Sequence, residues 1–242
     1  MTQENLNLKT PPAMEVVLEV LIANEENIDT EKLKITDENF TKQFSNQNDI
    51  YMFEAKIGDC EAPSSKSSLI GYTYENEEEL TQYRRNGFSY NKLGNYPGWD
   101  TFVSRAAEVY KNYPYNDKKI RRLGLRYINV IEVENYNGVP KDYFNIFLSS
   151  EEKASISNIK DFMIKFSEEN KKEGIRKNVN FHLSDLNQDF KAKFILDIDV
   201  LKTDVDTIEN EEELLEIFGK MRDTKNESFF SYLKENVLKH YR

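Results

Sequence analysis

The sequence predicts an α+β protein whose strands form a mainly antiparallel sheet. Residues 190–201 alternate between apolar and polar side chains, which indicates a strand with one buried and one solvated face, as antiparallel and mixed sheets contain. Residues 99–113 repeat apolar side chains every three or four positions, as an amphipathic helix does. The 15 Phe and 14 Tyr, with only 9 Gly and 6 Pro, supply the apolar surface that a folded core requires.

The first half of the chain is expected to form four strands and then a helix. Pro11 and Pro12 favour an extended approach to a strand at 14–23, and a polar stretch with a short helix near 37–45 follows. Trp99 opens the amphipathic helix, and a proline ends it. The other expected strands are 50–57, 69–74 and 87–92.

The second half is expected to repeat this succession of strands and helix. A long apolar strand at 122–133 is followed by the turn signal Asn137-Gly138 and by a partner strand at 143–148. The remaining expected elements are strands at 159–166, 178–183 and 190–201 and helices at 211–221 and 229–239.

Together these elements predict one compact domain, 1–242, built from two tandem strand-rich units. The units would span 11–117 and 118–242, and a helix packed on one sheet face would close each of them.

Composition limits the class of function. The formal net charge of −10 disfavours a nucleic-acid partner and an anionic membrane surface. With a single cysteine, Cys60, no intramolecular disulfide can form, which is typical of a cytoplasmic protein. The sequence has no apolar run of ~20 residues and no secretory signal at its start, so we expect no membrane partner.

The sequence carries no motif for catalysis or cofactor binding. Glycine motifs that cradle phosphates or dinucleotides are absent, and the two histidines, His182 and His240, have no partner at metal-ligand spacing. Cys60 has no basic neighbour that would activate its thiol. We therefore expect no catalytic residues and no cofactor, which favours a non-enzymatic protein.

Arg122, Arg126 and Asn129 are the candidate ligand-binding residues. The two arginines are an even number of residues apart on an expected strand, so they would share a face. Because guanidinium groups bind phosphate well, this strand could line a nucleotide or phosphate pocket. The plainer alternative is a solvated basic strand entry that balances the acidic helices.

Asp197 and Asp199 are candidates for a metal site. Two carboxylates two residues apart on a strand point to the same face, as in some divalent-cation sites. The alternative is the solvated face of an amphipathic strand.

An aromatic-rich segment between residues 72 and 99 predicts either core or a protein interface, because large aromatic side chains dominate both. The candidate interface residues are Tyr83, Phe88, Tyr90, Tyr96 and Trp99.

Several short motifs occur in a fixed order along the chain. They are PP-x-x-E-V from Pro11, the helix that begins at Trp99, RLGLRYIN at 122–129, LDIDV at 196–200 and N-E-x-F from Asn226. In these motifs the sequence resembles an uncharacterised, sporadically distributed bacterial protein family. The resemblance implies a horizontally mobile gene, as in defence or toxin–antitoxin loci, and it supplies no catalytic residues.

We therefore expect a non-enzymatic binding or regulatory protein of such a locus that acts through a protein partner encoded nearby, with a homodimer as an alternative. A second hypothesis is a nucleotide or phosphate sensor that uses the strand around Arg122 and Arg126. A third is a metal-dependent enzyme at Asp197 and Asp199.

Overall fold

The computed structural model describes residues 8–23, 28–56, 64–115, 119–146, 159–203, 205, 208 and 210–242. Cys60 lies outside these residues, so its predicted inertness stays a prediction.

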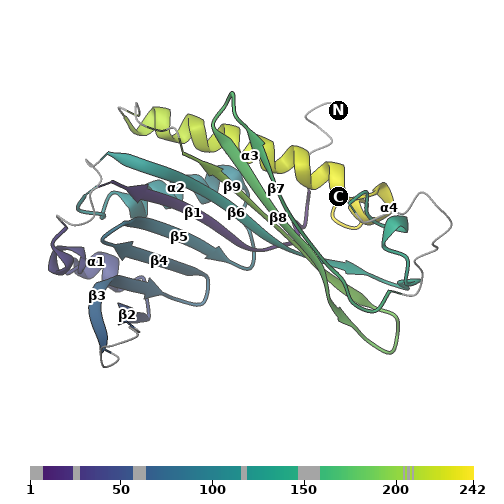
Figure 1. Ribbon diagram of the computed structural model, residues 1–242, viewed down its shortest axis with the longest axis horizontal. Helices are drawn as coiled ribbons and strands as arrows, with labels where there is room; N and C mark the ends of the chain where they lie inside the picture. The colour runs from purple at the N-terminus through teal and green to yellow at the C-terminus, as the bar shows by residue number, and fades with distance from the viewer. Residues whose placement is uncertain are drawn as a thin grey trace.

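The described chain is organised around a nine-stranded sheet in which every neighbouring pair is antiparallel, as the sequence predicts. The strand order is β2-β3-β4-β5-β1-β6-β9-β8-β7, which places the first strands of the two halves, β1 and β6, side by side at the centre (Figure 1). The strands are β1 (Ala13–Ile22), β2 (Asn46–Lys56), β3 (Ser64–Glu75), β4 (Glu79–Arg84), β5 (Gly87–Leu93), β6 (Ile120–Val133), β7 (Met163–Asn170), β8 (Ile175–Leu186) and β9 (Ala192–Lys202).

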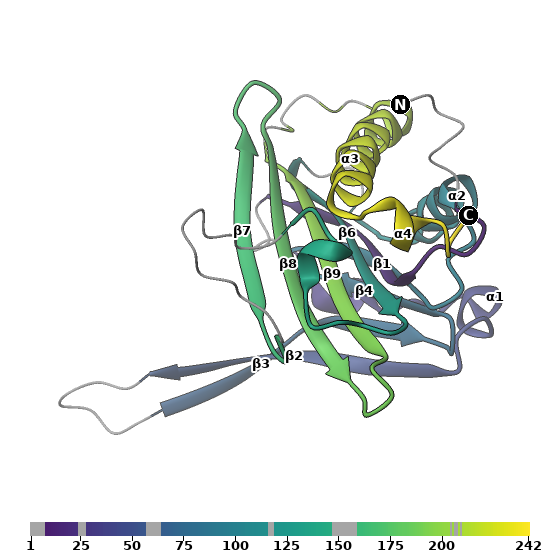
Figure 2. The same ribbon diagram turned by 90° about the vertical axis from the view of Figure 1, so that its right-hand side faces the viewer.

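The α-helices gather on one side of this sheet, and the opposite side carries none of them (Figure 2). The long helix α3 packs over β6 and β9, and α2 packs over β5. The helices are η3 (Thr30–Leu33), α1 (Glu38–Thr41), α2 (Trp99–Tyr110), η4 (Pro140–Asp142), α3 (Glu211–Tyr232) and α4 (Glu235–Leu238). Within the described residues, no helix has both the length and the apolar character of a membrane span.

The core fills the layer between the sheet and the helices. On β6, Leu123, Leu125 and Tyr127 are buried against the helices, whereas Arg122 and Arg126, which point to the other face, are partly exposed. On β9 the predicted apolar stripe is buried from Ala192 to Val200, but Phe190 precedes the strand in a left-handed conformation and is 63% exposed, so its predicted inward position is wrong.

The outer halves of β2 and β3 leave the body of the sheet as a two-stranded ribbon (Figure 2). Only residues 71–75 of β3 pair with β4, so residues 51–56 of β2 and their partners have no third strand. We call residues 51–56 and 64–69 the hairpin arm. Its side chains Tyr51, Met52 and Phe53 are exposed, with Phe53 77% accessible.

Three sequence predictions of local structure are wrong. The chain after Asn137-Gly138 forms the short helix η4, and Phe144 makes a single bridge to Leu233 instead of belonging to a strand; residues 147 and 148 lie outside the described range. The segment of β4 was not predicted as a strand, because its mixed residues show little hydrophobic contrast.

The third error concerns the C-terminal helices. The sequence predicts two helices at 211–221 and 229–239, but α3 continues without a break to Tyr232. Phe218, Met221 and Phe229 lie on one buried face, so packing on the sheet carries the helix through its polar middle.

Candidate functional site

Arg122 and Arg126 lie on the helix-free face of the sheet, and both are held by carboxylates. Arg122 and Arg84 pair with Glu19 on the neighbouring strand β1. Arg126 donates two hydrogen bonds to Asp197, from Nε to Oδ1 at 2.8 Å and from Nη2 to Oδ2 at 2.7 Å. These pairings engage both guanidinium groups within the protein, and phosphate binding at this strand stays a prediction.

Asp197 and Asp199 do share the helix-free face, as predicted, but they face different partners. Asp197 accepts from Arg126, and Asp199 accepts from Asn178 Nδ2 at 3.2 Å. Burial raises the pKa of Asp199. In the described part of the chain, no three His, Cys, Asp or Glu side chains converge as a metal site requires.

Three residues of the predicted aromatic interface belong to the core. Tyr83, Phe88 and Tyr90 are fully buried beneath α2, where the Tyr83 hydroxyl donates to the carbonyl of Val109 at 2.8 Å. These three aromatic side chains are buried in the folded protein and expose no surface to a partner.

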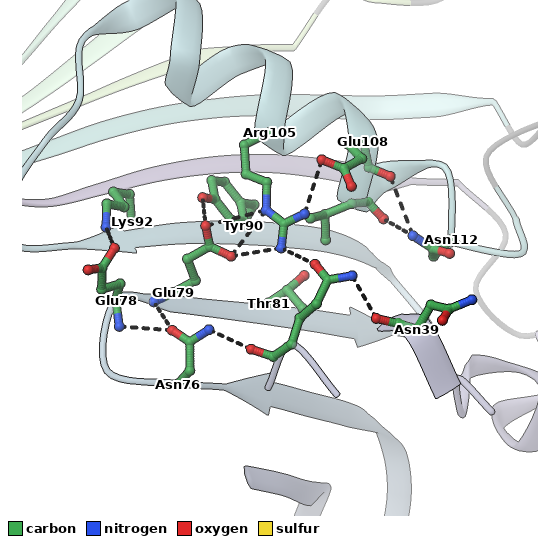
Figure 3. Close-up of polar contacts among 12 residues, drawn as sticks. Asn39, Asn76, Glu78, Glu79, Thr81, Tyr90, Lys92, Arg105, Glu108 and Asn112 are labelled. Atoms are coloured by element: carbon green, nitrogen blue, oxygen red, sulfur yellow. Dashed lines mark hydrogen bonds and ion pairs between the residues drawn. The ribbon is translucent and has the colours of Figure 1, made fainter. Parts of the chain in front are cut away.

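A polar network also joins α2 to the sheet (Figure 3). The Arg105 guanidinium contacts both carboxylate oxygens of Glu79, with Nη2 3.0 Å from Oε2, and it also pairs with Glu108 and Gln43. Tyr90 donates to Glu79 Oε1 at 3.0 Å. Since each of these groups has a partner within the network, we interpret the network as structural: it holds α2 against the sheet.

The two remaining aromatic candidates, Tyr96 and Trp99, and the candidate Asn129 line one pocket of about 360 Å³. It lies between the N-terminal approach to β1, the start of α2, strand β6 and the middle of α3, and we call it the α2–α3 pocket. Its remaining lining residues are Leu8, Pro11, Pro12, Ala13, Gly98, Tyr127, Arg222, Lys225, Asn226, Phe229 and Phe230.

Lys225 is the most unusual member of this pocket. The residue is only 9% exposed, and the described lining of the pocket offers its ammonium no carboxylate. Its Nζ lies 3.9 Å from the centre of the Tyr127 ring. Burial, and secondarily the nearby positive charge of Arg222, lower the pKa of Lys225 to about 7.

The Tyr127 ring acts in the opposite direction. A cation over an aromatic face gains about 0.5–2 kcal/mol, which favours the charged amine. This gain is smaller than the cost of removing an unpaired ammonium from water, so burial decides the direction of the shift.

Two further sources of positive potential face the same pocket. Arg222 lies one helical turn before Lys225, with its guanidinium carbon 5.6 Å from the centre of the Trp99 ring and its Nε 3.9 Å from Oδ1 of the exposed Asp223. Gly98 is the N-cap residue of α2; it lines the pocket and provides no side-chain cap for the first-turn amides. The N-terminus of a helix carries partial positive charge and free N–H groups.

The wall formed by β6 supplies polar atoms in fixed positions. The Tyr127 and Tyr96 hydroxyls are hydrogen-bonded to each other at 2.9 Å, and Asn129 Nδ2 donates to the carbonyl of Leu196 at 2.9 Å. Burial raises the pKa values of both tyrosines, so their hydroxyls keep their protons at neutral pH.

These features together make the pocket suitable for a small organic anion. Two cationic side chains and a helix N-terminus face it, and its described lining includes no aspartate or glutamate. Aromatic and proline side chains provide apolar walls for the body of a ligand.

Sequence reasoning missed Lys225 and Arg222. The signal for Lys225 was nevertheless present, because it stands on the apolar stripe of α3 formed by Leu214, Phe218, Met221 and Phe229. A lysine on the buried stripe of a helix has to be explained by a partner, a pocket or a ligand.

The two histidines belong to different elements of the fold. His182 lies on β8 with Nδ1 buried and without a hydrogen-bond partner among the described residues, whereas His240 is exposed after α4.

Comparison of the chain with models of known protein families gave no match. A comparison with curated proteins gave no match either, so the site rests on its geometry.

Proposed function

We propose that this protein is a non-enzymatic binding protein that senses a small organic anion in the α2–α3 pocket. The observation that carries the proposal is the buried, unpaired Lys225 beside Arg222 in a pocket whose described lining holds no acidic residue. Two cationic side chains close together at a partly buried site repel each other, and a bound anion would offset this repulsion.

The ligand would bind in the α2–α3 pocket and not at the strand around Arg122 and Arg126. Asn129 remains part of the site, and Arg222 and Lys225 take the place of Arg122 and Arg126. The aromatic walls favour a ligand with an apolar or aromatic body, and the volume of about 360 Å³ suits a molecule up to about the size of a mononucleotide.

Trp99 gives a direct test, because it is the only tryptophan and lines the pocket. Phenyl sulfate, whose charge is constant with pH, is expected to change Trp99 fluorescence saturably. Arg222→Gln is expected to weaken binding about tenfold or more, since hydrogen bonds to charged groups contribute about 1.5–3 kcal/mol. Calorimetry of both proteins checks the affinity.

The control is Arg176→Gln, which removes an exposed arginine from the helix-free side of the sheet. It should leave the affinity unchanged. Equal affinities of the parent protein and Arg222→Gln would contradict the proposal, as would the absence of any saturable change with phenyl sulfate and with phenyl phosphate.

A second function is favoured by the hairpin arm. We propose that Tyr51, Met52 and Phe53 bind a protein encoded next to this one, as expected for a regulatory component of a mobile defence or toxin–antitoxin locus in the cytoplasm. A two-stranded ribbon with exposed apolar side chains is marginally stable alone, and a partner that covers it would offset this cost.

Phe53→Ser is expected to abolish co-purification with the products of neighbouring genes and to change the free energy of unfolding by less than about 0.5 kcal/mol, because the side chain is exposed. Co-expression followed by affinity capture and a urea titration measure the two quantities. Met163→Ser, at an exposed residue on the opposite edge strand β7, serves as the control. A complex that survives Phe53→Ser, or an arm that only joins two copies of this chain, would argue against this function.

The two-unit organisation also remains a proposal. It is supported by the strand order, because each half starts with a central strand, continues at an outer edge of the sheet and returns strand by strand to the centre before a helix. The two units would then share the sheet and place their helices around the α2–α3 pocket.

A further inference from the structure

Lys225 combines the features of a reactive amine. It is buried, it has no acceptor or carboxylate partner among the described residues, and it borders a pocket large enough for a small molecule. Arg222 adds a second positive charge one helical turn away. A lysine in apolar surroundings beside another cation is a recognised arrangement for a nucleophilic amine.

We propose that the anion bound in the α2–α3 pocket is an aldehyde or ketone, and that Lys225 captures it as an imine. This inference rests on the proposed anion binding and specifies the chemistry of the ligand. Arg222 and the start of α2 would hold the anionic group, while the carbonyl carbon meets Nζ over the Tyr127 ring.

The reaction balances without a further reagent. The lone pair of the neutral amine attacks the carbonyl carbon and forms a C–N bond, both amine protons leave nitrogen, and the carbonyl oxygen departs as water. No oxidation or reduction occurs, so water is the only other product. The hydrogen-bonded hydroxyls of Tyr96 and Tyr127 line the same pocket and can pass protons to the departing oxygen.

The protonation of the amine agrees with this role. Arg222 faces it from α3, Tyr127 from β6 and Tyr96 from the segment before α2, while the lining residues before β1 carry no titratable side chain. With a pKa of about 7, an appreciable share of Lys225 is neutral at pH 7.5. An ordinary exposed lysine is neutral in roughly one molecule in a thousand at that pH.

The test uses pyridoxal 5′-phosphate as the probe, because it carries an aldehyde and a phosphate on one aromatic ring. The full-length protein is incubated with about one equivalent at pH 7.5, reduced with borohydride and mapped by peptide mass spectrometry. We expect the reduced adduct at Lys225 at a probe concentration at least tenfold below that needed to label Lys220, an exposed lysine of the same helix. Site mapping on the unaltered protein decides the question even if a variant fails to fold.

Pyridoxine 5′-phosphate is the matched ligand, since it has the same ring and phosphate but an alcohol in place of the aldehyde. If it binds competitively with phenyl sulfate and Lys225 stays unlabelled by the aldehyde, anion binding stands and the imine inference is overturned. If labelling spreads over exposed lysines and neither phosphate ligand changes Trp99 fluorescence, both proposals fail. Loss of labelling in Lys225→Arg, with labelling retained in Lys220→Arg, is the expected result.

Discussion

Replacing Lys225 by methionine is expected to stabilise the protein by about 4 kcal/mol at pH 6 and by about 1 kcal/mol or less at pH 10. The substitution keeps a long, flexible apolar stem and removes an unpaired buried amine. Urea denaturation of the two proteins across this pH range measures the difference.

The sign follows from the protons bound in each state. Below pH 7 the amine is charged in both the folded and the unfolded chain, so the folded state bears the whole cost of burial. Between about pH 7 and pH 10.5, the ordinary pKa of a lysine, the unfolded chain binds more protons than the folded one. The free energy of unfolding of the parent therefore rises with pH in this window, by about 1.4 kcal/mol per pH unit from this group.

Lys220→Met is the matched control, because Lys220 lies on the same helix but is exposed and paired with Glu216. Its effect should be small and nearly constant between pH 6 and 10. A stabilisation by Lys225→Met that did not change with pH would mean that Lys225 keeps its ordinary proton affinity in the folded protein.

Replacing Arg105 by methionine is expected to destabilise the protein by about 2–4 kcal/mol. The substitution leaves Glu79 largely buried with only the Tyr90 hydroxyl as its partner, and it removes the ion pair that links α2 to β4 (Figure 3). Removing one member of a buried ion pair costs more than removing both, because the remaining charge stays desolvated. Urea denaturation at pH 7 checks the magnitude.

A double-mutant cycle with Glu79→Gln separates the pair from the packing of the arginine stem. The double variant is expected to be more stable than the sum of the single effects predicts. Arg176→Met, at an exposed arginine whose carboxylate partner lies 3.7 Å away, should cost less than about 0.5 kcal/mol. Strict additivity in the cycle would contradict a coupled Arg105–Glu79 pair.

The site shows where sequence reasoning stops. The even spacing of Arg122 and Arg126 correctly places both on one face of β6. It does not reveal that the Arg126 guanidinium is hydrogen-bonded to Asp197 on β9. Likewise, the aromatic-rich segment is recognisable in the sequence, and yet only the fold separates the buried Tyr83 from the pocket-lining Trp99.

The sequence by itself determined the class of the fold and the inward faces of its regular elements, because the periods of strand and helix are local properties of the chain. The alternation along β9 and the apolar stripe of α2 are examples. Only the tertiary structure decided which charged side chains have an ion-pair partner and which do not, because the partners are far apart along the chain. Arg126 on β6 pairs with Asp197 on the adjacent strand β9. Lys225, in contrast, lies on the buried face of α3 and borders a pocket whose described lining offers no carboxylate. Burial sets the energy of a charge, and burial is a property of the assembled layers.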